Sequence, residues 1–381
     1  MKNDLDSICS LRVLGIMSGT SLDGVDCALC QVGPGVELLK LWSVPFPKPL
    51  HRRLQLAASG EATGWETAQL HHDLGRFYAT AAQRDPAARR AQLIGLHGQT
   101  LFHHPHPTRP ATLQIGEPAY LAESLRVPVV SNFRVADLAA GGQGAPLASL
   151  FHQVHFCWAG QHVCFHNLGG ISNVTSMTLR RGQAPRLRAF DTGPANVLLD
   201  LAMRHFTNGR QHCDRDGQFA ARGLVCEPLV KRWLKHPYFR KAPPKSTGRE
   251  LFGEKFLQPA LAEMKRLRLS PQDFVATLTE FTARSIALNY RLHLPSPPDR
   301  VVVAGGGTAN STLCHAIQRE LTALNPRLHF SHSKEYGWPA QAIEPAAFAL
   351  LAWRRWFGLH GNIPGTTGAR RSVVCGQITA H

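Results

Sequence analysis

The stretch from residue 19 to residue 26, Gly-Thr-Ser-Leu-Asp-Gly-Val-Asp, carries residue types that suit phosphate chemistry. Apolar runs at 13–17 and 25–29 flank it, so the pattern predicts a β-hairpin with these residues at its tip. Such a tip offers backbone amides and two hydroxyls to an anion, because glycine has no side chain to keep a ligand away. Asp23 would repel a bare phosphate, but it suits a phosphate that arrives with Mg²⁺, bound directly or through water. A nucleoside triphosphate meets both conditions.

The hairpin has a second interpretation, in which it is an ordinary turn at the edge of a domain. Asp23 and Gly24 are residue types that tolerate positive φ in a tight turn, and they would then serve the turn alone. The stretch matches neither Gly-x-x-x-x-Gly-Lys-[Ser/Thr] nor Gly-x-Gly-x-x-Gly, which removes the usual support for a P-loop or a Rossmann site.

Asp191 is a candidate general base. It lies in Phe-Asp-Thr-Gly-Pro-Ala-Asn at 190–196, after an apolar strand pattern, and Pro194 is placed near the first turn of a helix that should run to about Phe206. The helix dipole would keep a carboxylate at this place ionised, as a general base requires. Asp and Thr are also favoured in helix caps and flanking turns, so a structural role for Asp191 stays open.

Two further glycine turns repeat the arrangement of the hairpin. Asn-Leu-Gly-Gly-Ile-Ser-Asn at 167–173 lies between two apolar strand patterns, which indicates a duplicated fold whose halves hold one triphosphate. The run 305–307, Gly-Gly-Gly, follows an apolar strand and opens a helix. Backbone without side chains lets a flat adenosine lie close there, and the helix N-terminus favours its phosphates. Close packing alone would also explain these glycines.

Candidate substrate residues occur in two other segments. His-Gly-Gln-Thr at 97–100 follows a short buried strand, and open α/β sheets present ligands at the carboxyl ends of their strands. A glycine-containing turn would look the same. The loop 132–137 and the glycine-rich run 141–146 combine a fixed cation, Arg134, with a carboxylate, Asp137, as a substrate-closing segment would. The alternative is an interdomain linker.

Alternating strand and helix patterns indicate an α/β scaffold that positions these residues. Apolar positions at helical spacing predict helices, and short apolar runs between turn residues predict strands. The predicted helices cover 65–84, 119–125, 147–156, 227–235, 272–290 and 344–353. The predicted strands outside the two hairpins cover 36–47, 93–96, 128–131 and 301–304, and a glycine-rich tail covers 361–381.

Length, charge and cysteine content limit the class of protein. A chain of 381 residues is too long for one ordinary core and indicates two domains. The net charge of +16 could mark a nucleic-acid binder, but the basic residues are scattered and no RNA-binding motif is present, so we expect no nucleic-acid partner. The nine cysteines, an odd number, favour reduced thiols over a disulfide framework. With no membrane-length apolar run and no signal-peptide pattern, we expect a cytoplasmic protein without a membrane partner.

Two weaker patterns favour structural roles. Cys27-x-x-Cys30 is a single pair on a predicted strand, where positions three apart face opposite sides of the sheet. The run 103–106, His-His-Pro-His, lacks regular spacing and nearby acidic or cysteine partners, so a polar loop is favoured over a metal site.

Together, the motifs resemble those of the anhydro-N-acetylmuramic acid kinases, a family within the superfamily of actin-like and sugar-kinase ATPases. The resemblance runs from about Leu14 to Gly376, and the motifs that carry it lie at 17–26, 97–100, 112–116, 141–147, 167–173, 191–194, 244–250 and 305–307.

The resemblance implies an α/β, two-domain actin-like ATPase fold, a duplicated ribonuclease H-like fold with an interdomain active-site cleft. Residues 1–130 with about 345–381 would form the first domain, and 131–344 the second. It also implies ATP and Mg²⁺ as cofactors, an amino sugar as substrate and a homodimer. The implied reaction opens 1,6-anhydro-N-acetylmuramic acid with water and phosphorylates O6, giving N-acetylmuramic acid 6-phosphate and ADP in peptidoglycan recycling.

The family pattern also implies roles for individual residues. Asp191 would be the base that activates the water. The residues expected to contact ATP are Gly19, Thr20, Ser21, Leu22, Asp23, Gly24, Val25, Asp26, Gly169, Gly170, Gly305, Gly306 and Gly307. Those expected at the sugar are Gln99, Thr100, Arg134 and Asp137, and Asp23 would also bind the metal.

The chain departs from the family pattern at three positions. Asn132 replaces the usual Asp before Phe-Arg, Ala195 replaces a glycine, and Pro345 follows Glu344 where the family has alanine. Pro345 is acceptable if it occupies the first helical turn. A chaperone or scaffold built on the same ATPase fold is the alternative function, disfavoured because no peptide-binding module follows the ATPase part.

Overall fold

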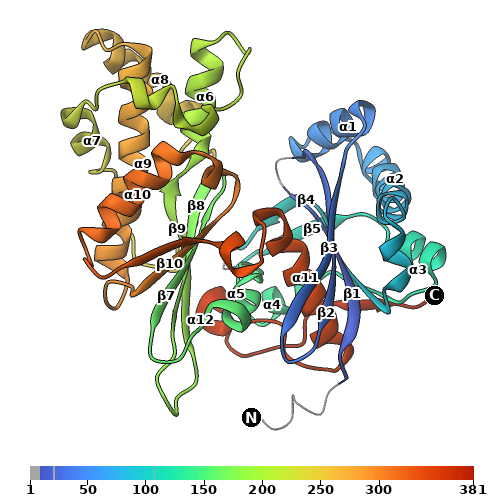
Figure 1. Ribbon diagram of the computed structural model, residues 1–381. Helices are drawn as coiled ribbons and strands as arrows, with labels where there is room; N and C mark the ends of the chain where they lie inside the picture. The colour runs from blue at the N-terminus through green and yellow to red at the C-terminus, as the bar shows by residue number, and fades with distance from the viewer. Residues whose placement is uncertain (1–8, 20–21, 107) are drawn as a thin grey trace. The chain divides into compact units, whose positions relative to one another are not determined.

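The computed structural model describes residues 9–19, 22–106 and 108–381, and the chain divides into two compact units. Unit 1 comprises Met1–His155 and Gly337–His381, and unit 2 comprises Phe156–Tyr336. Each unit has its own β-sheet with helices packed against it (Figure 1). Across the described ranges, no helix is both long and apolar enough to cross a bilayer.

The sheet of unit 1 has seven strands in the order β12-β6-β4-β1-β2-β3, with β5 paired to β4 outside this path. β1, β2 and β3 form an antiparallel meander, and β4 and β6 continue from β1 in parallel. Its strands are β1 (Leu11–Ser18), β2 (Gly24–Val32), β3 (Val36–Pro45), β4 (Leu93–His104), β5 (Ala111–Ile115), β6 (Val129–Ser131) and β12 (Gln377–Thr379).

The sheet of unit 2 has five strands in the order β11-β10-β7-β8-β9. As in unit 1, the three strands that come first in the chain, β7, β8 and β9, form an antiparallel meander. Strands β10 and β11 continue from β7 in parallel. Its strands are β7 (His162–Leu168), β8 (Ile171–Thr178), β9 (Arg186–Pro194), β10 (Arg300–Ala304) and β11 (His329–His332). Without the additions β5 and β12, unit 1 has the same strand order and directions. This repetition confirms the predicted duplicated, actin-like α/β fold.

The helices largely follow the predicted positions. Those of unit 1 are α1 (Lys48–Ala58), α2 (Gly64–Ala82), α3 (Ala119–Leu125), α4 (Arg134–Ala139), α5 (Ser149–Phe156), α11 (Ala340–Trp356) and α12 (Pro364–Thr367). Those of unit 2 are α6 (Asn196–Phe206), α7 (Glu227–Trp233), α8 (Glu254–Arg266), α9 (Pro271–His293) and α10 (Ser311–Thr322). In unit 2, α6, α7 and α8 gather around the long α9 (Figure 1).

Local sequence signals explain where the two long helices start. α2 begins with a capping box in which Thr63 and Glu66 bond each other's backbone amides, and α9 begins with the same device from Ser270 and Asp273. Helices α1, α4, α8 and α12 were not predicted, and α4 and α12 replace part of the predicted loop 132–137 and of the predicted glycine-rich tail. Prolines near the start of α1 and inside α8 hide the helical pattern, although proline is tolerated in a first turn.

Two glycines bring helix α11 directly onto the sheet of unit 1. Gly15 in β1 and Gly95 in β4 are register partners. A Cβ atom on Gly15 would lie 1.8 Å from the carbonyl oxygen of Pro345, and one on Gly95 would lie 2.3 Å from that of Phe348. Helix α11 therefore packs backbone to backbone against one face of the sheet, while α2 covers the other face (Figure 1).

Pro345 does not lie in the first turn of its helix, which was the condition for accepting a proline at this position. Helix α11 begins at Ala340, so Pro345 lies inside the helix. Because proline has no N–H, the carbonyl of Gln341 loses its usual intrahelical donor.

The chain enters unit 2 at Phe156, later than the boundary near residue 131 that the sequence suggests. The segment up to α5 stays with unit 1 because β6 extends the first sheet beside β4. The return at Gly337 likewise precedes the suggested position near residue 345, because all of α11 belongs to unit 1.

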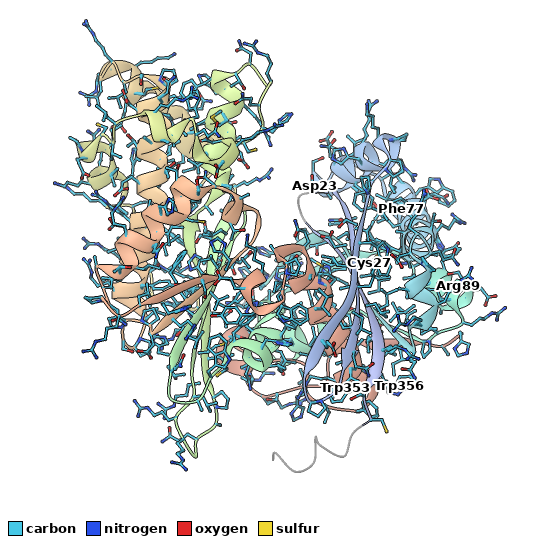
Figure 2. The ribbon with its side chains drawn as sticks, in the orientation of Figure 1. Asp23, Cys27, Phe77, Arg89, Trp353 and Trp356 are labelled. Carbon is cyan, nitrogen blue, oxygen red and sulfur yellow. The ribbon has the colours of Figure 1, made fainter. Side chains whose placement is uncertain are left out.

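The C-terminal segment is folded rather than a loose tail. Its strand β12 pairs antiparallel with β6 at the edge of the sheet. In the last turn of α11, the indole N–H of Trp353 donates to the carbonyl of Cys9 over 3.1 Å. Trp353 and Trp356 lie at one end of the unit 1 sheet, and Asp23 lies at the opposite end (Figure 2). The phosphate-loop candidate is thus at the end away from this anchor.

Candidate functional site

The predicted β-hairpin exists, with Asp23 at its tip (Figure 2). The backbone N–H of Leu22 donates to the carbonyl of Gly19 over 3.2 Å, and the N–H of Phe46 donates to the carbonyl of Asp23 over 3.2 Å. The side chain of Asp23 is exposed. The predicted ATP contacts at residues 20 and 21 lie outside the described residues.

Positive φ in this hairpin falls at a different residue from the predicted Asp23-Gly24 pair. Leu22 has φ of 61°, and its side chain is buried in the core of unit 1. Gly24 is required for a different reason, because a Cβ there would lie 2.5 Å from the carbonyl oxygen of Val44 in β3. The glycine admits the neighbouring strand, while Val25, next in the chain, is buried.

Asp23 and Asp26 place two carboxylates near one another. Ser43 donates its hydroxyl to the carboxylate of Asp26. Burial raises the pKa of Asp26, the Ser43 hydrogen bond opposes this, and the charge of Asp23 raises it further. A cation would relieve this repulsion. No group of three or more His, Cys, Asp and Glu suited to a metal occurs among the described residues. One or two carboxylates completed by phosphate oxygens are a usual site for Mg²⁺, so these residues fit that ion.

Gln99 and Thr100 lie within β4 rather than in a loop after it, which corrects the prediction. The strand continues to His104 because β5 folds back on it. Gln99 is fully buried, and its Nε2 donates to the carbonyl of Gly19 over 3.1 Å. Gln99 therefore supports the hairpin through the backbone of Gly19. The hydroxyl of Thr100 accepts a hydrogen bond of 3.3 Å from Nε2 of Gln114.

Arg134 is held rigidly at the start of α4. Its Nη1 donates to the carbonyl of Gly144 over 2.7 Å, and its Nε and Nη2 lie 3.2 and 2.8 Å from Nε2 of His97. Nδ1 of His97 lies 2.7 Å from the carbonyl of Gly98, which can only accept, so Nδ1 carries the proton and Nε2 accepts from Arg134. Burial, and then the charge of Arg134, lower the pKa of His97 well below its ordinary value.

Burial lowers the pKa of Arg134 to about 10, so the guanidinium remains charged at neutral pH. The protein contacts above use one N–H of each terminal nitrogen. Among the described residues, the second N–H of each makes no hydrogen bond, while the charge of Glu344 acts on the guanidinium and raises its pKa. Arg134 thus has the charge and the fixed orientation that a substrate contact needs.

Asp137 does not face a ligand. It is fully buried, and its Oδ2 accepts the N–H of Gly144 over 2.7 Å. Its Oδ1 accepts from the side chains of Asn362 and Thr367 over 2.6 and 2.7 Å. The carboxylate therefore ties the glycine-rich loop to the C-terminal segment. This geometry replaces the predicted substrate contact of Asp137 with a supporting role for the loop that Arg134 also contacts.

The departure at Asn132 has a structural explanation. Asn132 has φ of 55°, a left-handed conformation that asparagine tolerates better than most residues. Its side-chain amide donates to Gln377 in β12 over 3.2 Å. The residue thus fastens the C-terminal strand.

In unit 2, the turn between β7 and β8 contacts the start of α6. The N–H of Ala195 donates to the carbonyl of Gly170 over 2.9 Å, and the N–H of Asn196 donates to that of Gly169 over 3.1 Å. The side chain of Asn196 also donates to the Gly169 carbonyl over 2.9 Å. These bonds fix the predicted phosphate turn against the helix that follows Asp191.

The turn after β10 lies against the end of β7, next to the turn between β7 and β8. A Cβ on Gly305, whose φ is 90°, would lie 2.5 Å from Oδ1 of Asn167, and one on Gly307 would lie 2.8 Å from Cβ of Leu168. Both glycines are therefore required for packing. Gly306 has no atom within 4 Å of such a Cβ, so its backbone stays open to a ligand. The structure thus brings together the two glycine turns, 169–170 and 305–307, that the sequence predicted for ATP in this unit.

Asp191 lies within β9, three residues before the strand ends at Pro194, rather than beyond a strand end. Its Oδ2 accepts the backbone N–H of Thr247 over 2.9 Å. Its own N–H donates to the carbonyl of Lys245 over 3.1 Å, and its carbonyl accepts the hydroxyl of Tyr238 over 2.7 Å. The segment 245–247 thus fixes both the backbone and the carboxylate of Asp191.

The pKa of Asp191 is raised to about 6, whereas the sequence suggested a carboxylate kept ionised by a helix dipole. Burial is the main cause, and Glu250 adds to it, while the amide of Thr247 and the charge of Lys245 act against it. A carboxylate with this pKa is mostly ionised at pH 7 and is a stronger base than an ordinary aspartate.

Lys245 and Asn289 are functional candidates that sequence reasoning missed. Lys245 is only 4% exposed, and its Nζ donates to the carbonyls of Tyr238 and Phe239 and to Oδ1 of Asn289 over 3.3, 3.2 and 2.6 Å. Asn289 in turn donates to the carbonyl of Thr192 over 2.9 Å. The segment 244–250 contributes to the family resemblance, but nothing in its local sequence signals a buried lysine.

Comparisons with known proteins agree with these motifs. The family model described as "Anhydro-N-acetylmuramic acid kinase" matches residues 11–381. A protein of that name from Cyanothece sp. is 43% identical over 97% of this chain and 100% of its own length. Its namesakes from Acaryochloris marina and Trichormus variabilis are each 41% identical, covering 97% and 96% of this chain and 99% and 96% of their own.

Proposed function

The chain belongs to the anhydro-N-acetylmuramic acid kinase family, and we propose that it uses ATP to open and phosphorylate 1,6-anhydro-N-acetylmuramic acid. The observation that carries this proposal is the environment of Asp191: a largely buried carboxylate, with a pKa of about 6, held by the amide of Thr247. A plain sugar kinase uses a base to deprotonate a hydroxyl. The 1,6-anhydro bridge leaves no free hydroxyl at O6, so here the base acts on water.

The reaction balances with Asp191 as the general base. Asp191 takes a proton from a water molecule, and the water oxygen forms a bond to the anomeric carbon, C1. The bond between C1 and O6 breaks, and its electron pair stays on O6. This oxygen attacks the γ-phosphorus, and the bond to the bridging oxygen of the β-phosphate breaks. The products are N-acetylmuramic acid 6-phosphate and ADP.

The nucleotide contacts follow from the backbone at the glycine turns. In unit 2, the open backbone at Gly306 and the turn at Gly169 and Gly170 suit adenosine and phosphate. In unit 1, the hairpin tip with Asp23 takes the terminal phosphates. Asp23, with Asp26 beside it, would hold Mg²⁺ directly or through water, and the ion would supply positive charge that favours phosphoryl transfer.

The sugar contact rests on Arg134. Its two available N–H groups and fixed charge suit the carboxylate of the lactyl group on the muramic acid. Gln99 keeps the hairpin in place through the carbonyl of Gly19. The reaction serves recycling of cell-wall sugars in the cytoplasm, where ATP is supplied. The homodimer that the family implies stays a prediction for sedimentation measurements.

The proposal is tested by incubating the protein with ATP, Mg²⁺ and the anhydro-sugar in ¹⁸O-water and identifying products by mass spectrometry. The label should appear on the anomeric carbon of the sugar 6-phosphate at early times, before exchange of the reducing end with solvent. Asp191→Asn should lose this product by a factor on the order of 10² while still binding ATP. Label mainly in inorganic phosphate would mean simple ATP hydrolysis, as in a chaperone-type ATPase, and would overturn the proposal.

A further inference from the structure

Thr247 carries a buried hydroxyl that the mechanism above does not use. Its Oγ1 is buried and has no hydrogen-bond partner among the residues that the structure describes. Buried polar groups are normally paired, because leaving one unpaired costs stability. The same residue donates its backbone N–H to Oδ2 of Asp191 over 2.9 Å. The unpaired hydroxyl therefore belongs to a residue that directly contacts the carboxylate that we assign as the base.

The surroundings hold Thr247 at this place from two sides. The backbone N–H of Asp191 donates to the carbonyl of Lys245 over 3.1 Å, so residues 245 and 247 are both bonded to residue 191. Lys245 is itself anchored by three hydrogen bonds from its ammonium group. The backbone of Thr247 thus has a fixed position relative to the carboxylate.

The carboxylate has one oxygen left for a water molecule. Oδ2 of Asp191 is occupied by the Thr247 amide, whereas Oδ1 has no hydrogen-bond partner within the described part of the chain. A water that donates one proton to Oδ1 needs a second acceptor for its other proton if its lone pair is to point at a carbon. A threonine hydroxyl accepts through two lone pairs.

We propose that Oγ1 of Thr247 is the second hydrogen-bond partner of the attacking water and orients it toward the anomeric carbon. This inference rests on the proposed function. The water gives one proton to Asp191 and forms the bond to C1. Its other proton points at Thr247 before the attack and remains on the new hydroxyl at C1 afterwards. Thr247 gains and loses no proton in the balance.

The test compares variants that keep the backbone amide. Thr247→Val has nearly the same shape but no hydroxyl, and Thr247→Ser restores the hydroxyl without the methyl group. Thr247→Val should lower kcat by about tenfold to hundredfold, the size expected for a misplaced reactant, with KM for ATP unchanged. Thr247→Ser should recover kcat to within about threefold of wild type. Thr80→Val makes the same change at an exposed threonine of α2 outside the proposed site, so it is the matched control and should keep kcat.

The pH profile separates orientation of the water from a general disturbance of the loop. Thr247→Val keeps the hydrogen bond from the backbone N–H of residue 247 to Asp191. The acidic limb of kcat/KM should therefore stay at the same pH in this variant. Equal kcat in wild type and Thr247→Val would overturn this inference alone. So would a shifted limb together with a Thr247→Ser variant as slow as Thr247→Val, because that pattern marks a structural role. A wild-type protein that forms no sugar 6-phosphate would overturn the proposed function and this inference with it.

Discussion

The ammonium group of Lys245 lies 2.6 Å from Oδ1 of Asn289, and through this bond α9 is joined to the loop that holds Asp191. Burial lowers the pKa of Lys245 to about 8, and the charge of Asp191 opposes this. Lys245, with its three hydrogen-bond acceptors, lies two residues before Thr247, whose amide contacts the carboxylate of Asp191 that we propose as the base.

Replacing Lys245 should therefore change both stability and the pH dependence of activity. Lys245→Met keeps the length of the side chain but leaves buried acceptors unpaired, so unfolding in urea should become easier by about 2–4 kcal/mol. The positive charge also lowers the pKa of Asp191, so its loss should move the acidic limb of kcat/KM to higher pH. Lys245→Arg keeps the charge and is the control for the limb. An acidic limb at the same pH in Lys245→Met and wild type would contradict the effect of the Lys245 charge on the pKa of Asp191.

Asp191 should limit activity at acidic pH and should cost stability at neutral pH. A base must be ionised, so kcat/KM should fall below about pH 6, where Asp191 takes up a proton. The pKa is raised from 3.8 in the unfolded chain to about 6 in the folded protein. Between these values the folded state binds more protons, so its stability declines as pH rises.

Asp191→Asn removes this cost and should raise stability at pH 7 by roughly 1–2 kcal/mol, allowing for partial exposure to solvent. The gain should shrink as pH falls from about 6 toward about 4, because the folded wild-type protein then takes up a proton on Asp191 and no longer buries its charge. Urea unfolding at pH 7 and pH 4.5 measures it. A variant less stable than wild type at pH 7 would show that the charge of Asp191 stabilises the fold.

Asp23→Asn should weaken use of Mg-ATP far more than it weakens folding. The side chain is exposed at the hairpin tip and supports no core, so the unfolding free energy should change by less than about 0.5 kcal/mol. Loss of a metal-binding carboxylate should reduce activity by about tenfold to hundredfold, partly restored by more Mg²⁺. Titration of Mg²⁺ at fixed ATP checks this. Glu37→Gln, at another exposed acid of unit 1, is the control. Equal activity of the two variants in the Mg²⁺ titration would indicate that the hairpin is an ordinary turn.

Gly15→Ala should disrupt the packing of α11 on the sheet. The new Cβ would lie 1.8 Å from the carbonyl oxygen of Pro345, and backbone must move to make room. We expect a loss of at least about 3 kcal/mol in the free energy of unfolding. Gly35→Ala adds the same methyl group where no atom lies within 4 Å, and should change stability by less than about 0.5 kcal/mol. Similar stability of the two variants would contradict backbone-to-backbone packing.

Much of the scaffold could be predicted from local patterns. The boundaries of α3 and the hairpins β1–β2 and β7–β8 follow from apolar periodicity and from glycines at the turns. The length of β4 could not be predicted, since its extension to His104 depends on pairing with β5. The C-terminal strand β12 escaped prediction for the same reason, because its partner β6 is far away in the sequence.

By itself, the sequence indicated which residue types suit a nucleotide and a sugar, because glycines at turns and a carboxylate close to a helix start carry their chemistry in their type and spacing. The tertiary structure alone decided what each carboxylate does. Asp137 is surrounded by donors from the glycine loop and the C-terminal segment and cannot reach a ligand, whereas Asp191 keeps one oxygen available. The pKa of Asp191 and the burial of Lys245 were also decided there, because desolvation and hydrogen bonds come from segments that meet only when the chain folds.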